Sequence, residues 1–287
     1  MAVLLKGAAV TAALNEKMKA QVAELAQKGI TPTLAILRVG ERPDDISYER
    51  GAMKRCETIG VSVRNVVLPE DVSQKDLMAA VEELNNDDSV HGVLIFRPLP
   101  KHLDEEAVRR ALLPSKDMDG ITDGSLAGVF TGSGEGFAPC TAQACMEILD
   151  HYGYDCKGKR AVVIGRSLVV GKPVAMMLMA KHATVTVCHT RTVDMPSVTR
   201  NAEILIVAAG KAGAVDAKYL SPGQVVIDVG INVDEEGKLC GDVKFDEAES
   251  VVAAITSVPG GVGTVTTSVL VSHVVEAAKR TLQEVKK

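Results

Sequence analysis

The stretch VVIGRSLVVGKP, residues 162–173, constrains the fold of this chain more than any other dozen residues. An apolar run typical of a β-strand ends at Gly165, and a helix is expected to begin at Gly171 with Pro173 in its first turn, where proline is tolerated. A strand, a glycine turn and a helix start in succession place backbone N–H groups and a helix dipole where a phosphate can bind. Because Ser167 replaces the middle glycine of G-x-G-x-x-G, the segment alone fits a nucleotide site and a plain βα turn about equally well.

Strand-like and helical patterns alternate along nearly the whole chain. Strands are expected at residues 33–39, 62–68, 90–96, 161–164, 184–188, 204–208, 225–229 and 253–256. Helices are expected at 10–27, 46–59 and 74–84, from about Gly171 and Met195, and over 266–285. Such alternation predicts parallel sheets that bind ligands at the carboxyl ends of their strands.

We therefore expect an α/β protein of two domains. The first is an N-terminal α/β catalytic domain, residues 1–138, completed by a C-terminal helix, 267–287, that returns to it. The second is a Rossmann-type dinucleotide-binding domain with a parallel sheet, residues 139–266. A Gly-rich connection, 120–136, precedes this second series of strands.

Composition limits the partners of the protein. A net charge of −5 argues against a nucleic-acid surface. No apolar run approaches the ~20 residues that span a bilayer, and no signal-peptide pattern is present. The six cysteines have no C-x-x-C or zinc spacing, which favours free thiols and no metal site. We expect a cytoplasmic protein with neither nucleic-acid nor membrane partners.

The residues after the strand at 184–188 bear on the choice of cofactor. NAD-preferring folds usually place an acidic side chain near this strand end, to hold the ribose hydroxyls. No acid follows here, whereas Arg166, Thr190 and Arg191 can pair with the 2′-phosphate of NADP. NADP is therefore favoured. NAD stays open, since one arginine can serve either cofactor and both arginines could be ordinary surface residues.

Six motifs occur in an informative order: KDMDGIT (116–122), PCT (139–141), GRSLVVGKP (165–173), DVGIN (228–232), GDV (241–243) and PGGVGTVT (259–266). Together they closely resemble the methylenetetrahydrofolate dehydrogenase/cyclohydrolase family, over essentially the entire chain. The resemblance implies a homodimeric enzyme that oxidises 5,10-methylenetetrahydrofolate with NADP. Many members also hydrolyse the methenyl product. The folate is then expected in a cleft between the domains.

The resemblance also implies roles for individual residues. Tyr48 is expected to stack against the folate and Asp119 to hold the pterin, both as catalytic and substrate-binding residues. The backbone at Pro259, Gly260 and Gly261 is expected to approach the substrate. The residues expected to bind the cofactor are Gly165, Arg166, Ser167, Thr190, Arg191 and Ile231.

The chain departs from the family pattern at the hydrolytic centre. The family usually has a lysine four residues after the tyrosine, where this chain has Ala52, and a glutamine where this chain has Phe96. An i, i+4 pair shares one helix face, so only position 52 can aim an amine alongside Tyr48. Lys54 is rotated away from that face, Arg55 lies one turn further along, and a guanidinium is a poor base.

We therefore expect a dehydrogenase whose cyclohydrolase activity is weak or absent. The alternative is a fully bifunctional enzyme, in which Arg55, Lys54 or Arg97 stands in for the missing lysine. A remote alternative is a folate- or nucleotide-binding module without turnover.

Overall fold

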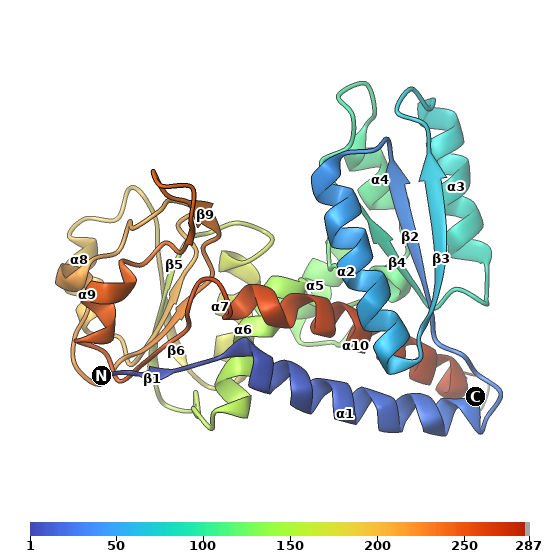
Figure 1. The fold of residues 1–287 in the computed structure, drawn as a ribbon. Helices are drawn as coiled ribbons and strands as arrows, with labels where there is room; N and C mark the ends of the chain where they lie inside the picture. Colours follow the sequence, from blue (N-terminus) through green and yellow to red (C-terminus); the bar gives the residue numbers. More distant parts are fainter. Residues whose placement is uncertain (285–287) are drawn as a thin grey trace. The chain divides into compact units, whose positions relative to one another are not determined.

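The computed structural model describes residues 1–284, which fall into two compact units (Figure 1). The six-stranded unit comprises Met1–Ala12 and Thr141–Thr266. The three-stranded unit comprises Ala13–Cys140 and the residues from Thr267 onward. Two long helices, α1 (Gly7–Ala26) and α10 (Val262–Glu284), each begin in the six-stranded unit and continue into the three-stranded unit.

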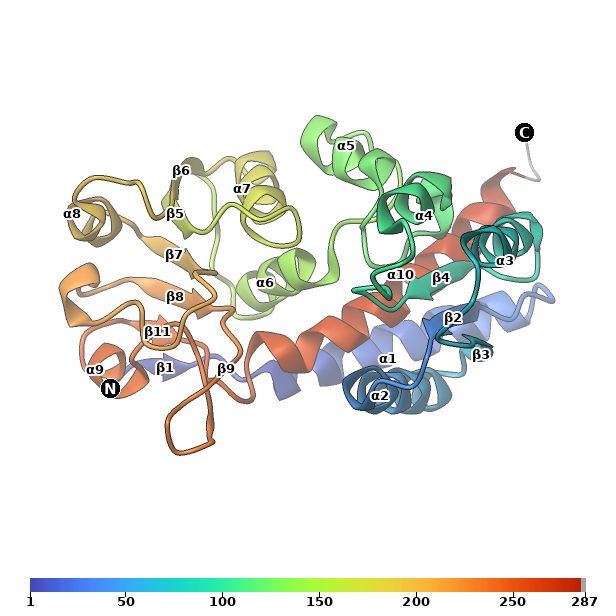
Figure 2. The same cartoon turned by 90° about the horizontal axis from the view of Figure 1, so that it is seen from above.

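The six-stranded unit is built on a fully parallel sheet, in the order β1-β11-β8-β7-β5-β6 (Figure 2). Its strands are β1 (Val3–Leu4), β5 (Arg160–Ile164), β6 (Thr184–Cys188), β7 (Ile204–Val207), β8 (Val225–Asp228) and β11 (Ala254–Ile255). The central strands are buried apolar runs, as expected for a covered parallel sheet. The chain passes from β5 outward to β6 and then back to β7, so the strand order reverses between β5 and β7. Open α/β sheets bind ligands at this switch point.

Helices and a small hairpin surround this sheet. The helices are α6 (Cys140–His151), α7 (Gly171–Ala180), α8 (Met195–Arg200), α9 (Phe245–Glu249) and the 3-10 turn η2 (Ala217–Tyr219). The antiparallel hairpin of β9 (Asn232–Val233) and β10 (Leu239–Cys240) follows β8. Helix α7 packs on β5 and β6, and α9 packs on β11.

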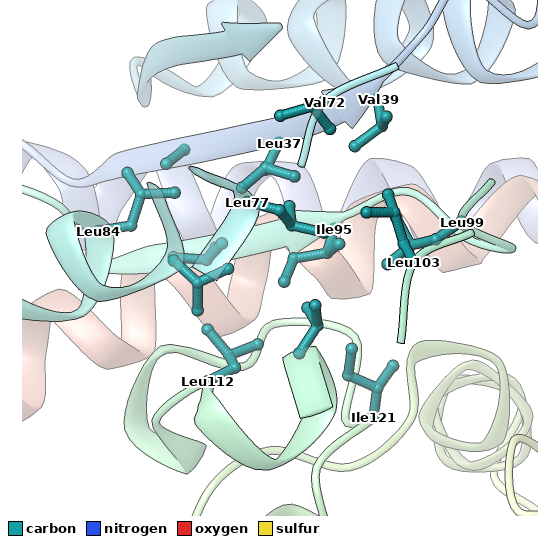
Figure 3. Packing of buried hydrophobic residues seen from close by; sticks show 14 of the residues in the cluster. Leu37, Val39, Val72, Leu77, Leu84, Ile95, Leu99, Leu103, Leu112 and Ile121 are labelled. Atoms are coloured by element: carbon teal, nitrogen blue, oxygen red, sulfur yellow. The ribbon is translucent and has the colours of Figure 1, made fainter. Parts of the chain in front are cut away.

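The three-stranded unit has a parallel sheet in the order β3-β2-β4. Its strands are β2 (Thr33–Val39), β3 (Ser62–Leu68) and β4 (Gly92–Ile95). Its other helices are α2 (Pro43–Ile59), α3 (Gln74–Asn86), α4 (Glu105–Ala111), the 3-10 turn η1 (Pro114–Lys116) and α5 (Asp123–Thr131). One apolar cluster joins the sheet to helix α3 and to the segments that follow β4: Leu37 and Ile95 lie with Leu77, Leu112 and Ile121 (Figure 3).

The predicted α/β class, with parallel sheets and a Rossmann-type unit, is confirmed. The structure differs from the predicted ranges at the N-terminus, because β1 pairs with β11 and groups Met1–Ala12 with the six-stranded unit rather than with residues 13–138. The Gly-rich connection 120–136 contains helix α5. Residue 285, the predicted end of the last helix, lies outside the described residues. None of the helices in residues 1–284 combines the length and hydrophobicity that a membrane crossing requires.

Candidate active site

The turn after β5 lies at the switch point of the large sheet and is closed by two glycines. Gly165 has φ of 123°, a conformation that L side chains rarely adopt. A Cβ on Gly165 would collide with the carbonyl oxygen of Ala208 after β7, and one on Gly171 would collide with the carbonyl of Gly165. Only glycine therefore lets the turn pass this close to the neighbouring strand end.

Ser167 has a role in this turn that the sequence did not predict. Its Oγ accepts hydrogen bonds from the backbone N–H groups of Val170, at 3.1 Å, and Gly171, at 3.4 Å. The expectation that the N–H groups at the start of α7 are free for a phosphate is therefore corrected in part. Ser167 already pairs with two of them, so a bound phosphate would meet the earlier part of the turn or displace this contact.

The turn after β6 leaves the same edge of the sheet. Ile164 and Cys188 are partners in the β5–β6 register, and the Gly165 N–H donates to the Cys188 carbonyl at 2.9 Å. His189 shapes this second turn, because its Nδ1 accepts the Arg191 N–H at 3.1 Å. The predicted cofactor residues Arg166, Thr190 and Arg191 are exposed on these two neighbouring turns. Cationic and hydroxyl side chains at one sheet edge form a surface suited to phosphate groups.

A cavity of about 200 Å³ opens beyond the ends of β8 and β11. Ile231, predicted to bind the cofactor, lines this cavity together with Pro259, Gly260 and Gly261, predicted to bind the substrate. Leu239 of the β9–β10 hairpin lines it too. The structure therefore brings these four predicted residues together within the six-stranded unit, beyond the ends of β8 and β11 rather than of β5 and β6.

Two buried carboxylates hold the loops beside this cavity. Asp242 accepts the N–H groups of Gly210, at 2.8 Å, and Lys211, at 2.9 Å, and the side-chain amide of Asn232, at 2.9 Å. Asp228 accepts three backbone N–H groups, from Gly230 and residues 242 and 243, at 2.9–3.0 Å. Burial raises the pKa of Asp228 to about 6. These carboxylates lie in the DVGIN and GDV motifs, but sequence reasoning gave them no role.

In the three-stranded unit, Tyr48 and Phe96 form an aromatic pair. Tyr48 projects from α2 with 39% of its surface exposed, and its ring centroid lies 5.8 Å from that of Phe96 in an edge-to-face arrangement. Phe96 itself is buried, just after β4. Ala52, one turn after Tyr48, is fully buried. The positions where the family pattern has lysine and glutamine therefore hold only apolar groups.

Asp119 lies on the loop after β4, which the side chain of Asp117 fixes. The Asp117 carboxylate is fully buried and accepts the N–H groups of Ile121, at 3.0 Å, and Thr122, at 2.7 Å, so its role is structural. Asp119 is partly exposed. Burial raises its pKa to about 6, and the negative charge of Asp117 adds to this effect. The positive charge of Arg97 opposes the rise.

The sequence did not predict the two side chains that contact the backbone of this loop, Cys140 and His273. The Cys140 thiol lies against the Asp119 carboxylate and donates to the Met118 carbonyl at 3.2 Å. His273 of α10 lies 2.9 Å from the same carbonyl, so its Nδ1 carries a proton there. Burial lowers the pKa of His273 to about 4, which keeps the ring neutral. The PCT motif contained Cys140, but no local signal linked it to His273, 133 residues away.

No group of three or more His, Cys, Asp or Glu side chains able to hold a metal ion occurs in the described part of the chain. The six-stranded unit has the features of a dinucleotide-binding α/β protein. Its parallel sheet has a glycine turn at the switch point, exposed arginines beside that turn, and a cavity beyond the ends of β8 and β11. The three-stranded unit, taken by itself, carries the exposed Tyr48 and the partly buried carboxylate of Asp119.

Comparison with known proteins identifies the family. The model described as "Tetrahydrofolate dehydrogenase/cyclohydrolase, catalytic domain" matches residues 5–119, and the "NAD(P)-binding domain" model of the same family matches residues 139–282. The chain is 49% identical to "Bifunctional protein FolD" of Clostridioides difficile (strain 630), over 96% of both chains. The chain belongs to the tetrahydrofolate dehydrogenase/cyclohydrolase family.

Two solved structures agree with this assignment. The crystal structure of the bifunctional FolD dehydrogenase/cyclohydrolase from Campylobacter jejuni matches with a TM-score of 0.94 at 40% identity, over 98% of this chain and 100% of that one. The dehydrogenase-cyclohydrolase of Trypanosoma brucei, complexed with NADP cofactor and an inhibitor, matches with a TM-score of 0.90 at 36% identity, over 98% of each chain. These names carry both activities, so they fit the fully bifunctional alternative better than the expectation of weak cyclohydrolase.

Proposed function

We propose that this protein is an NADP-dependent 5,10-methylenetetrahydrofolate dehydrogenase. The observation that carries the proposal is the glycine turn at the switch point of the large sheet, flanked by exposed Arg166 and Arg191 in place of an acidic side chain. The names of the relatives and the NADP complex of the Trypanosoma brucei structure support it.

The residues of the six-stranded unit fit this cofactor. Gly165 leaves room beside β7, while Arg166, Ser167, Thr190 and Arg191 would hold the phosphates. Ile231 would line the cavity next to the nicotinamide. NADP, when bound, accepts the hydride.

The remaining chemistry asks little of the protein beyond alignment. The transferred carbon is flanked by two nitrogens, so hydride loss leaves a resonance-stabilised cation. Such a step needs positioning and a fitting electrostatic field rather than proton transfer. Tyr48 would stack against the folate, Asp119 would hold the pterin, and the backbone at residues 259–261 would approach the substrate.

We further propose that hydrolysis of the methenyl product is weak or absent. The specific observation is the buried methyl group of Ala52, one helical turn after Tyr48, whose ring pairs with that of Phe96. Water attack requires a general acid or base, and this position offers none. Two of the side chains suggested as substitutes for the missing lysine do not face Ala52 as free amines. Lys54 is exposed on a different face of α2, and Arg97 pairs with Glu105 at 3.1 Å. The bifunctional alternative, favoured by the names of the relatives, requires an acid/base group from elsewhere.

We also propose a cytoplasmic homodimer that acts on tetrahydrofolate one-carbon substrates and has no nucleic-acid partner. Sedimentation of the purified protein at micromolar concentration tests the dimer. A sedimentation mass near 60 kDa, twice the 30.3 kDa of the chain, is expected. A mass near that of one chain would contradict it.

The dehydrogenase itself is tested by following the absorbance of the reduced cofactor. Wild-type protein with 5,10-methylenetetrahydrofolate and NADP is expected to turn over, and to do so more efficiently than with NAD. If both ligands bind but no cofactor is reduced, the chain is a binding module and the proposal is wrong.

A further inference from the structure

A buried ion pair joins β2 to α2 next to the position of the missing lysine. Arg38 Nε donates to Glu49 Oε2 at 2.8 Å, and the two side chains are 10% and 9% exposed. The Arg38 guanidinium also donates to the carbonyl of Gly40. Burying two charges costs as much as their attraction returns, so a pair of apolar side chains would serve stability equally well. The pair therefore calls for an explanation other than stability.

Glu49 and Ala52 lie on the same face of α2. The buried face of this helix consists of Asp45, Glu49, Ala52, Cys56 and Ile59. Residues three apart on a helix have neighbouring Cβ atoms, and long side chains lean toward the helix N-terminus. A long side chain at position 52 would therefore extend toward the turn that carries Tyr48 and Glu49.

The two buried carboxylates on this face of α2 each have a cationic partner. Glu49 is paired with Arg38, and the Asp45 carboxylate lies 3.8 Å from Nε of Arg42. On the other side, burial raises the pKa of the Cys56 thiol to about 12, so it stays neutral. An ammonium group brought to this face would meet the Glu49 carboxylate first.

We propose that the Arg38–Glu49 pair reinforces the proposed loss of hydrolysis at Ala52 and Phe96: it fixes a carboxylate beside position 52, so a lysine restored there would be held as an ion-pair partner and would not serve hydrolysis. The inference rests on the proposed loss of cyclohydrolase activity. Both residues would act through an amine at position 52 and are positioning residues.

The physical reason is the effect of the Glu49 carboxylate on the pKa of a lysine amine at position 52. A carboxylate within about 4–6 Å of an ammonium group favours its charged form by one to three pKa units. An amine that assists hydrolysis must give up and regain its proton near neutral pH. Glu49 therefore favours the protonated form of such a lysine, and the positive charge of Arg38 offsets part of this effect. Each pKa unit that remains lowers the neutral fraction of the lysine about tenfold.

The test compares four proteins: wild type, A52K/F96Q, R38M/E49L and R38M/E49L/A52K/F96Q. Methenyltetrahydrofolate hydrolysis and NADP reduction are measured for each between pH 6 and pH 9. The R38M/E49L change replaces the ion pair by apolar side chains of similar length and should retain dehydrogenase activity. We expect A52K/F96Q to hydrolyse little at pH 7 and to gain activity only toward pH 9. The fourfold variant should exceed it about tenfold at pH 7, with its rise shifted to lower pH.

Equal hydrolysis rates and equal pH profiles in the two lysine variants would overturn the inference. If the fourfold variant unfolds, E49Q in the A52K/F96Q background removes the charge alone and should shift the profile in the same direction. The wild-type protein tests the proposed function separately. Rapid wild-type hydrolysis would contradict that proposal, while the ratio between the lysine variants would still decide this one.

Discussion

Asp119, which we propose holds the pterin, reduces the stability of the folded protein at neutral pH because its carboxylate is buried. Its pKa is raised from 3.8 to about 6, chiefly by burial, so the folded protein holds this proton more tightly than the unfolded chain does. The associated stability is fully present below pH 3.8 and is lost as the pH rises through 6. At neutral pH the ionised carboxylate is therefore unfavourable for folding, as expected of a group kept for a ligand.

Asp119→Asn tests whether the carboxylate lowers stability at neutral pH while it strengthens folate binding. At pH 8 the variant should melt about 3 °C higher than wild type, and the gain should vanish near pH 4, where the wild-type carboxyl is protonated. The KM for the folate substrate should rise at least tenfold, because a charge-assisted hydrogen bond is lost, while the Kd of NADP stays the same. Thermal melts across pH and steady-state kinetics measure both. A variant less stable than wild type at pH 8 would contradict the account.

Single residues of the site differed in how well the sequence revealed them. The KDMDG motif pointed to Asp119, and the resemblance to the family pointed to Tyr48; the roles of both residues stay predictions. The contacts that Cys140 and His273 make with the Asp119 loop could not be predicted, because these two residues meet only through tertiary packing and no local pattern links them. Arg38 and Glu49 were also missed, since two charged residues eleven positions apart usually lie on a solvated surface.

Among the elements, the turn from β5 to α7 depends on glycine for two reasons. Gly165→Ala adds a side chain at φ of 123° and also pushes it into the Ala208 carbonyl, so we expect a loss of about 2–4 kcal/mol of unfolding free energy and weaker NADP binding. Gly158→Ala is the matched control. Gly158 has φ of 74° but nothing within 4 Å of a Cβ, so only about 1 kcal/mol should be lost. Equal losses in denaturant titrations would mean that close approach to β7 is unimportant.

The loops beyond β7 and β8 depend on Asp242. Asp242→Ala removes the acceptor of two backbone N–H groups and of the Asn232 amide, so the unfolding free energy should fall by about 2–4 kcal/mol. Asp246→Ala, at an exposed position in α9, is the control and should change it by less than about 0.5 kcal/mol. Chemical denaturation measures both variants. A small effect at Asp242 would show that these loops are held by other contacts.

Long, regular elements could be predicted and short ones could not. Strands β2, β3 and β6 occur at the predicted bounds because each is a run of five to seven residues rich in β-branched or other apolar side chains. Strand β1 has only two residues and pairs with β11, about 250 positions away, so no local pattern reveals it. Helix α5 was hidden by its glycines, of which Gly128 leaves room for the backbone of Glu135.

At the level of the whole chain, the alternation of strands and helices was enough to predict parallel sheets and a Rossmann-type unit. It did not predict that the first twelve residues join the six-stranded unit, because that grouping depends on the pairing of β1. Family membership follows from motifs spread over the entire chain and from matches covering residues 5–119 and 139–282. Membership alone does not fix which of the family's two reactions this chain performs, whereas Ala52 and Phe96 bear directly on that question.

The most direct test of the account is the hydrolysis of 5,10-methenyltetrahydrofolate by the wild-type protein, measured beside NADP reduction with the methylene substrate. We predict cofactor reduction at an ordinary enzymatic rate and hydrolysis no faster than in buffer, because the buried methyl group of Ala52 and the ring of Phe96 supply no acid or base. Enzyme-accelerated hydrolysis at a rate comparable to reduction would contradict this prediction and establish the bifunctional alternative.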